Sequence, residues 1–249
     1  LVCHGMDQRH LAATALGVAR RQQAQLRQVE GVDGGDECLG QPDRTGAELV
    51  EVDAVEPVAP DLSGLSATEK QVLDELVAAG RIMHEMFRVQ ATPCYDALAA
   101  RIAGHGGADA AALQRYWRIN AGPWDRRMHH EPFVGVGERP EGANFYPQDL
   151  TRADLDLIEA GDGGLADLFT MVRFDQDGEL AAVPYSEFFG PGLAQAATHL
   201  RNAAALTDNE SLAAFLESRA AAFLSDDYFE SDMLWMDVDS HVDVTIGPY

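Results

Sequence analysis

Lysine is almost absent from this sequence, in which Lys70 is the only one. The 249 residues include 41 acidic and 18 basic side chains, so the formal net charge at pH 7 is -23. A field of this sign repels the phosphates of nucleic acids and of anionic membranes. We therefore expect neither a nucleic acid nor a membrane as a partner.

Cysteine and long apolar runs are also scarce. Cys3, Cys38 and Cys94 are far apart, odd in number and in no CxxC pair, which argues against both a disulfide framework and a zinc ribbon. We interpret Cys94 as a small buried hydrophobic residue. No apolar run reaches the roughly 18 to 20 residues that a membrane-spanning helix needs. The first residues lack the cationic start and cleavage site of a signal peptide, which slightly favours the cytoplasm and leaves the compartment open.

The first 62 residues contain little that would fold alone. Residues 31–46 favour turns throughout, and the stretch that follows them is typical of an extended linker broken by proline. We expect residues 1–62 to be a low-order leader or a non-native segment. Residues 63–249 are then the folded part, and an apolar content of 46% gives the chain enough apolar residues for a sizeable core.

Helices dominate the predicted fold. Ser66 and Glu69 form the Ser-x-x-Glu pattern of a capping box, and the apolar spacing after them predicts a long amphipathic helix. Further helices are predicted over residues 95–103, 108–119, 151–160, 193–206 and 211–224. The last of them, 211–224, is expected to open at Thr207-x-x-Glu210.

Alternating apolar residues predict only a little β-structure. Residues 169–174 and 180–183 flank a turn and predict a β-hairpin, and the alternation over residues 242–246 predicts a final strand. The fold class is therefore α+β, mostly helical, with one hairpin and a C-terminal strand, and the lack of βαβ alternation disfavours a nucleotide-binding sheet. Because a chain that stops soon after an apolar strand leaves that strand uncovered, we expect a fragment of a larger protein.

Two histidine-containing motifs fall short of a metal site. His84-Glu85 has no second histidine at the spacing of a HExxH zinc motif. His129, His130 and Glu131 are adjacent, so at most two of them could share one metal. The favoured alternative is that Arg126, Arg127, His129 and His130 form salt bridges or hydrogen bonds with the acidic surface. We predict no metal ligand and no catalytic residue in this chain.

Spaced carboxylates near the C-terminus resemble a calcium loop. Asp237, Asp239, His241 and Asp243 have its spacing, but Val242 stands where such a loop needs glycine. A strand with one acidic face fits the spacing better. The many carboxylates around it predict pairing with arginines from elsewhere or an acidic groove, and such a groove would attract a free amino terminus.

Residues 120–149 combine glycine, proline and large aromatic residues, and they are too aromatic for a solvated linker. Long ordered loops of this kind often line a binding site. Polar-tipped aromatic residues in irregular segments are good peptide contacts. The candidate substrate-binding residues are Trp124, Asn144, Tyr146 and Tyr249, with packing in the core as the alternative role for each.

Five stretches carry long motifs rich in Trp, Tyr and Pro. They are IMHEMFRVQ at 82–90, the WxxNxGPWD run at 117–125, GANFYPQDLT at 142–151, VPYSEFF at 183–189, and the whole of 224–249. Together they resemble the bacterial branch of the dipeptidyl peptidase III family, which often carries the name of Nudix hydrolases. The resemblance covers residues 66–249 and implies the amino-terminal half of a two-lobed, largely helical zinc metallopeptidase that removes dipeptides from peptide amino ends.

The resemblance also implies what this chain lacks. The family's zinc site is a helical HExxGH plus a later Glu, and the Glu inside that motif acts on a zinc-bound water. In the family, an ExYxD motif that directly follows the IGPY sequence helps to hold the peptide amino terminus. Neither this motif nor the zinc motif occurs in these residues. We expect zinc in the full-length family member, none bound by this chain, and no activity from this chain alone. A non-catalytic helical module that binds peptides is the alternative.

Overall fold

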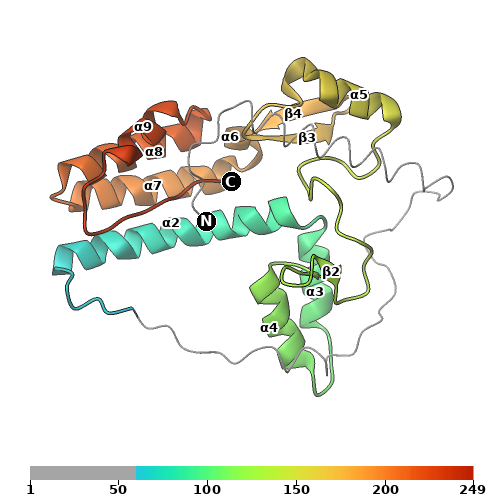
Figure 1. The fold of residues 1–249 in the computed structure, drawn as a ribbon, viewed down its shortest axis with the longest axis horizontal. Coiled ribbons are helices and arrows are strands. Elements are labelled where there is room, and N and C mark those ends of the chain that lie inside the picture. The colour runs from blue at the N-terminus through green and yellow to red at the C-terminus, as the bar shows by residue number, and fades with distance from the viewer. Residues whose placement is uncertain (1–59, 249) are drawn as a thin grey trace. The chain divides into compact units, whose positions relative to one another are not determined.

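The computed structural model describes residues 60–248. Predictions that concern residues 1–59, Cys3 and Cys38 among them, and Tyr249 lie outside the described residues. The described part forms two compact units. The first unit contains Arg88–Ala182, and the second unit contains residues 60–87 and 183–248. Figure 1 labels most of the elements of both.

The long helix α2 (Ala67–Ala91) begins as predicted. The Ser66 backbone N–H donates to Glu69 Oε2 at 2.7 Å, and the Glu69 N–H donates to Ser66 Oγ at 3.1 Å, which confirms the capping box. Side chains at helical spacing follow one face and are each at most 8% exposed: Val72, Leu76, Ala79, Met83 and Met86. The helix up to Phe87 belongs to the second unit, and its last turn belongs to the first.

Further helices make up most of the rest of the second unit (Figure 1). They are α6 (Tyr185–Phe188), α7 (Gly190–Leu206), α8 (Glu210–Ser225) and α9 (Phe229–Met236). α7 and α8 pack on each other through side chains that are no more than 1% exposed, such as Leu200, Phe215 and Leu216. Asn209 caps α8 by accepting the Leu212 N–H at 2.9 Å, so the prediction that Thr207 opens this helix is wrong.

The first unit mixes short helices with two small hairpins. Its elements are α3 (Tyr95–Ala103), α4 (Ala110–Asn120), β1 (Trp124–Asp125), β2 (Glu131–Pro132), α5 (Arg152–Ala160), η2 (Asp162–Gly164), β3 (Thr170–Phe174) and most of β4 (Leu180–Pro184). β3 and β4 form the predicted hairpin, and Thr151 caps α5 in a capping box with Asp154. One apolar cluster joins α3 and α4 to Phe133, and another joins α5 to Val172 of β3.

The predicted C-terminal strand is wrong. Residues 237–248 have no regular structure, although Val242 and Ile246 are buried and alternate with exposed residues. A strand requires a neighbouring strand for its backbone groups. Here the Asp239 N–H donates to Ser211 Oγ and the Asp239 carbonyl accepts from the Asn209 side chain, so this segment is held by the start of α8.

The structure also tests the predictions for Cys94 and for residues 120–149. Cys94 is exposed, with a left-handed φ of 52° just before α3, so the interpretation of it as a buried residue is wrong. It is disulfide-bonded, so the argument against disulfides from the cysteine spacing is wrong for Cys94. Residues 120–149 are an ordered loop, within which β1 and β2 form a short antiparallel pair that the sequence did not indicate. Within residues 60–248, every helix is too short or too polar to cross a membrane.

Candidate functional site

Trp124 is buried in the first unit, where it lies opposite Pro132 in the β1–β2 pair. Its indole Nε1 donates to the Gly137 carbonyl at 3.0 Å. The next residue, Asp125, accepts a hydrogen bond from the Tyr116 hydroxyl. Burial raises the pKa of Tyr116 to about 12, with a further contribution from Asp125. Trp124 therefore lies in a tightly bonded part of the loop.

The turn between β1 and β2 carries positive charge. Burial lowers the pKa of His130, and Arg139 and Arg126 lower it further. We expected His130 to pair with acidic groups, but arginines outweigh Asp125 among its neighbours. Within residues 60–248, no group of three or more His, Cys, Asp or Glu side chains could hold a metal ion.

Asn144 ties the loop to the last turn of α2. Its Nδ2 donates to the Val89 carbonyl at 2.7 Å, and its backbone N–H donates to the Gln90 carbonyl at 3.0 Å. Its own carbonyl accepts from Arg173 Nη2 at 2.9 Å. One residue thus connects α2, the loop and β3 within the first unit.

Tyr146 is half-buried beside the apolar cluster that includes Leu155 and Val172. Burial raises the pKa of its phenol. The ring packs beside that cluster, and the hydroxyl has no hydrogen-bond partner among the described residues. A peptide-binding role for Trp124, Asn144 and Tyr146 stays a prediction, and Tyr249 lies outside the described residues.

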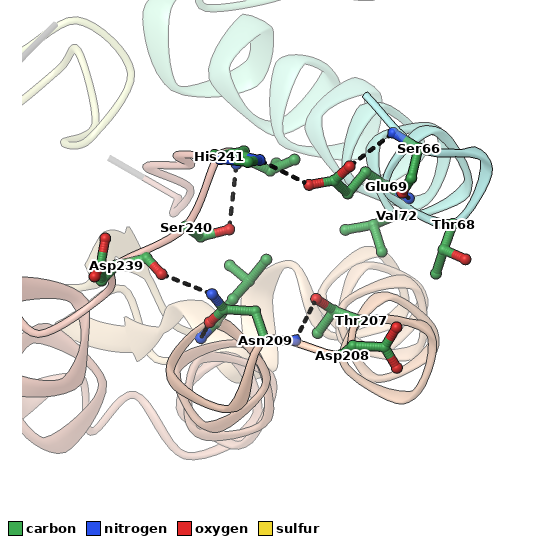
Figure 2. A pocket seen from close by; sticks show the side chains of 12 residues that line it. Ser66, Thr68, Glu69, Val72, Thr207, Asp208, Asn209, Asp239, Ser240 and His241 are labelled. Carbon is green, nitrogen blue, oxygen red and sulfur yellow. Dashed lines mark hydrogen bonds and ion pairs between the residues drawn. The ribbon is translucent and has the colours of Figure 1, made fainter. Parts of the chain in front are cut away.

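The second unit contains a pocket of about 480 Å³ (Figure 2). Three segments that are distant in sequence meet around it: the start of α2, the turn between α7 and α8, and residues 239–242. Its polar lining is Ser66, Thr68, Glu69, Thr207, Asp208, Asn209, Asp239, Ser240 and His241, and its apolar lining is Val72, Leu212 and Val242.

Hydrogen bonds fix the wall of this pocket, as Figure 2 shows. Glu69 Oε1 lies 3.2 Å from His241 Nδ1, while Glu69 Oε2 accepts the Ser66 N–H. The Ser66 N–H and hydroxyl, with His241, hold the pKa of Glu69 below its usual value. On the other side, Asn209 Nδ2 donates to the Asp239 carbonyl at 2.6 Å.

Asp208 and Asp239 give the pocket its unpaired negative charge. Both are exposed, and neither carboxylate has a hydrogen bond or ion pair within the described part of the chain. Together with Glu69, they favour a small ligand that carries an amino group over an anion.

The sequence indicated only one side of this pocket. An acidic groove was one of two alternatives for the carboxylates around Asp239, but nothing placed Ser66 and the start of α2 beside them. The available signals were the two N-terminal helix caps, Ser66 and Asn209, because a capping residue lies where the chain turns and leaves polar groups at the surface.

Comparison with known proteins gives a consistent picture. No protein-family model matches the chain. It is 29% identical over 245 residues to Nudix hydrolase 3 of Arabidopsis thaliana. Its structure is similar to that of DPP III from Caldithrix abyssi, with a TM-score of 0.68 and 37% identity, and to that of dipeptidyl-peptidase III from Corallococcus sp. strain EGB, with a TM-score of 0.75 and 36% identity. Over the matched part, the chain has the fold of dipeptidyl peptidase III.

These similarities confirm the predicted resemblance to the dipeptidyl peptidase III family and the mostly helical α+β class. The match covers 76% of this chain and 32% of the plant protein. It covers 73% of this chain and 35% of the Caldithrix protein, and 82% of this chain and 39% of the Corallococcus protein. The chain therefore spans about a third of the length of the proteins that it matches.

Replacing Glu69 with glutamine separates its charge from its capping role, because glutamine also accepts the Ser66 N–H. The pKa of folded Glu69 lies below its ordinary value of 4.5, so its stabilising contribution is present above that value and is lost as the pH falls through the folded-state pKa. In urea unfolding, we expect Glu69→Gln to be less stable than the wild type at about pH 6, and we expect this difference to shrink as the pH falls below 4.5.

The matched control is Asp208→Asn, which removes a charge from the same pocket without removing a hydrogen bond. It should not lose stability at neutral pH. If the stability difference between Glu69→Gln and the wild type were the same at every pH, the role assigned to the Glu69 charge would be wrong.

Proposed function

We propose that this chain is the amino-terminal portion of a zinc-dependent dipeptidyl peptidase, an enzyme that removes dipeptides from the amino ends of peptides. The observation that carries the proposal is the joint similarity in fold and sequence to two dipeptidyl peptidase III structures at 36% and 37% identity. At that identity, the chain and these structures are similar in sequence as well as in the arrangement of their helices.

In this proposal, the zinc ion is held by residues outside this chain. The 249 residues contain neither a HExxH nor a HExxGH motif. Residues 60–248 also offer no group of three or more metal-binding side chains. Because the residues present do not fit a zinc site, we assign no catalytic step to them, and the role of this portion is to bind the peptide.

The peptide contacts in this proposal are Trp124, Asn144, Tyr146 and Tyr249. Tyr146 has the strongest support, since its ring is packed while its hydroxyl has no partner among the described residues. A phenol held in this way can bond a peptide backbone without first losing another hydrogen bond. Asn144 would act by holding the loop in place.

Complementation tests the proposal. The purified chain is mixed with the portion of the Corallococcus enzyme that it does not match, and turnover of a dipeptidyl naphthylamide is measured with zinc present. We expect no turnover from either polypeptide alone and turnover from the mixture. In the mixture, Tyr146→Phe should raise KM while kcat and the unfolding midpoint stay nearly unchanged.

Two results would contradict the proposal. One is the absence of turnover from a mixture in which the two polypeptides co-elute. The other is one bound zinc per chain together with turnover by this chain alone, which would place the zinc site within these residues.

A non-catalytic peptide-binding module is a second candidate, and the pocket of the second unit favours it. Glu69, Asp208 and Asp239 line that pocket together with hydroxyl groups, a setting that suits a free amino terminus. In titrations with a short peptide, we expect binding to weaken roughly tenfold when its amino terminus is acetylated, and to weaken also in Asp208→Asn. Asp177→Asn, on an exposed turn elsewhere, is the control. Equal affinity for the free and the acetylated peptide would rule this candidate out.

A further inference from the structure

α9 turns an apolar face toward solvent. Phe229, Met233 and Met236 are 75%, 48% and 63% exposed, and their i, i+4, i+7 spacing places them in one stripe along the helix. Ser231, on the other side of the helix, is 1% exposed, and α9 packs on α8. A surface helix of a globular protein normally has the opposite arrangement, with its polar face toward water.

Carboxylates run along both edges of this stripe. At about 100° per residue, Glu230 and Asp237 fall beside one edge and Asp232 beside the other. All three are exposed. Arg219 of α8, which is itself buried, forms an ion pair with Asp232 and so fixes the position of that carboxylate.

Helix stability accounts for only part of these charges. Carboxylates in the first turn, such as Glu230 and Asp232, favour the helix macrodipole. Asp237 stands at the opposite end, where a carboxylate opposes that dipole. The carboxylates along both sides of the apolar stripe, from the start of the helix to its end, are therefore explained better by a ligand that binds to the stripe.

We propose that the α9 face, defined as Phe229, Met233 and Met236 with their edging carboxylates Glu230, Asp232 and Asp237, binds an amphipathic helix of another polypeptide. The bound helix would have an apolar side edged by lysine or arginine. Two methionines and an aromatic ring at this spacing fit the side chains of a helix laid along them. The net charge of -23 would steer a cationic partner to this face.

The same charges disfavour the other occupants of an apolar face. An anionic lipid surface would be repelled by Glu230 and Asp237, whereas the charge of Asp232 is balanced by Arg219. A second copy of this chain would bring like charges together across a symmetric contact. The inference goes beyond the proposed function, since it uses neither the pocket nor the loop at residues 120–149.

The test uses the full chain and a labelled helical peptide of about 18 residues, with leucine at i, i+3, i+4 and i+7 and lysine along both edges. Fluorescence anisotropy gives the affinity. We expect one peptide per chain, at least about tenfold weaker binding to Met233→Glu, and a smaller salt dependence in Glu230→Gln/Asp237→Asn. Leu157→Glu, at a position 41% exposed on α5, is the matched control and should bind like the wild type.

The unfolding midpoint of each variant is measured to check that the variant is folded. We expect all of them to fold because the substituted side chains are exposed. Three results would overturn the proposal. They are equal binding to Met233→Glu and the wild type, equal binding of a peptide whose lysines are replaced by glutamate, and self-association of the wild type that Met233→Glu abolishes without any peptide binding.

Discussion

The packing of α2 against α7 joins two distant parts of the sequence into the second unit. His199 Nδ1 lies 2.7 Å from Glu75 Oε2, although the two residues are 124 positions apart. Nearer the start of α7, a Cβ on Gly192 would come within 2.7 Å of Met86 Cε, so glycine permits a close approach there. The partly exposed ion pair contributes at most about 1 kcal/mol. The five buried side chains on one face of α2 contribute more to the stability of the second unit, at about 1.5–3 kcal/mol for each of the larger ones.

The pocket in the second unit depends on this packing. Its lining comes from the start of α2, the turn between α7 and α8, and residues 239–242. Glu69 and His241 are 172 positions apart, and they meet only because α2 lies with the later helices. A local change in the α2 contact would thus alter the position of Glu69 relative to Asp239, and with it the charge that a ligand meets.

Local signals in the sequence predicted the elements that local interactions determine. The capping box at Ser66 and the hairpin of β3 and β4 each depend on neighbouring residues, so their patterns were sufficient. The strand over residues 242–246 was predicted from its alternating apolar residues. Val242 and Ile246 are indeed buried, but a strand also needs a partner that only the tertiary structure supplies. α9 was missed because its apolar residues face solvent rather than the core.

The candidate site could be predicted only in part for the same reason. The aromatic content of residues 120–149 indicated an ordered loop, and the loop is ordered. The hydrogen bonds that hold this loop in place could not be predicted from the sequence. Asn144 bonds to Val89, which is 55 positions away, and Arg173 bonds to Asn144, which is 29 positions away. The family resemblance rested on long motifs and needed no such contacts.

Native-state hydrogen exchange on the full chain tests most directly whether α2 belongs to the second unit. If it does, the slowest amides of α2 between Val72 and Met86 and those of α7 and α8 will open with one common free energy and one common dependence on denaturant. Exchange of the α2 amides at a clearly lower free energy than those of α8, with a denaturant dependence of their own, would contradict this account.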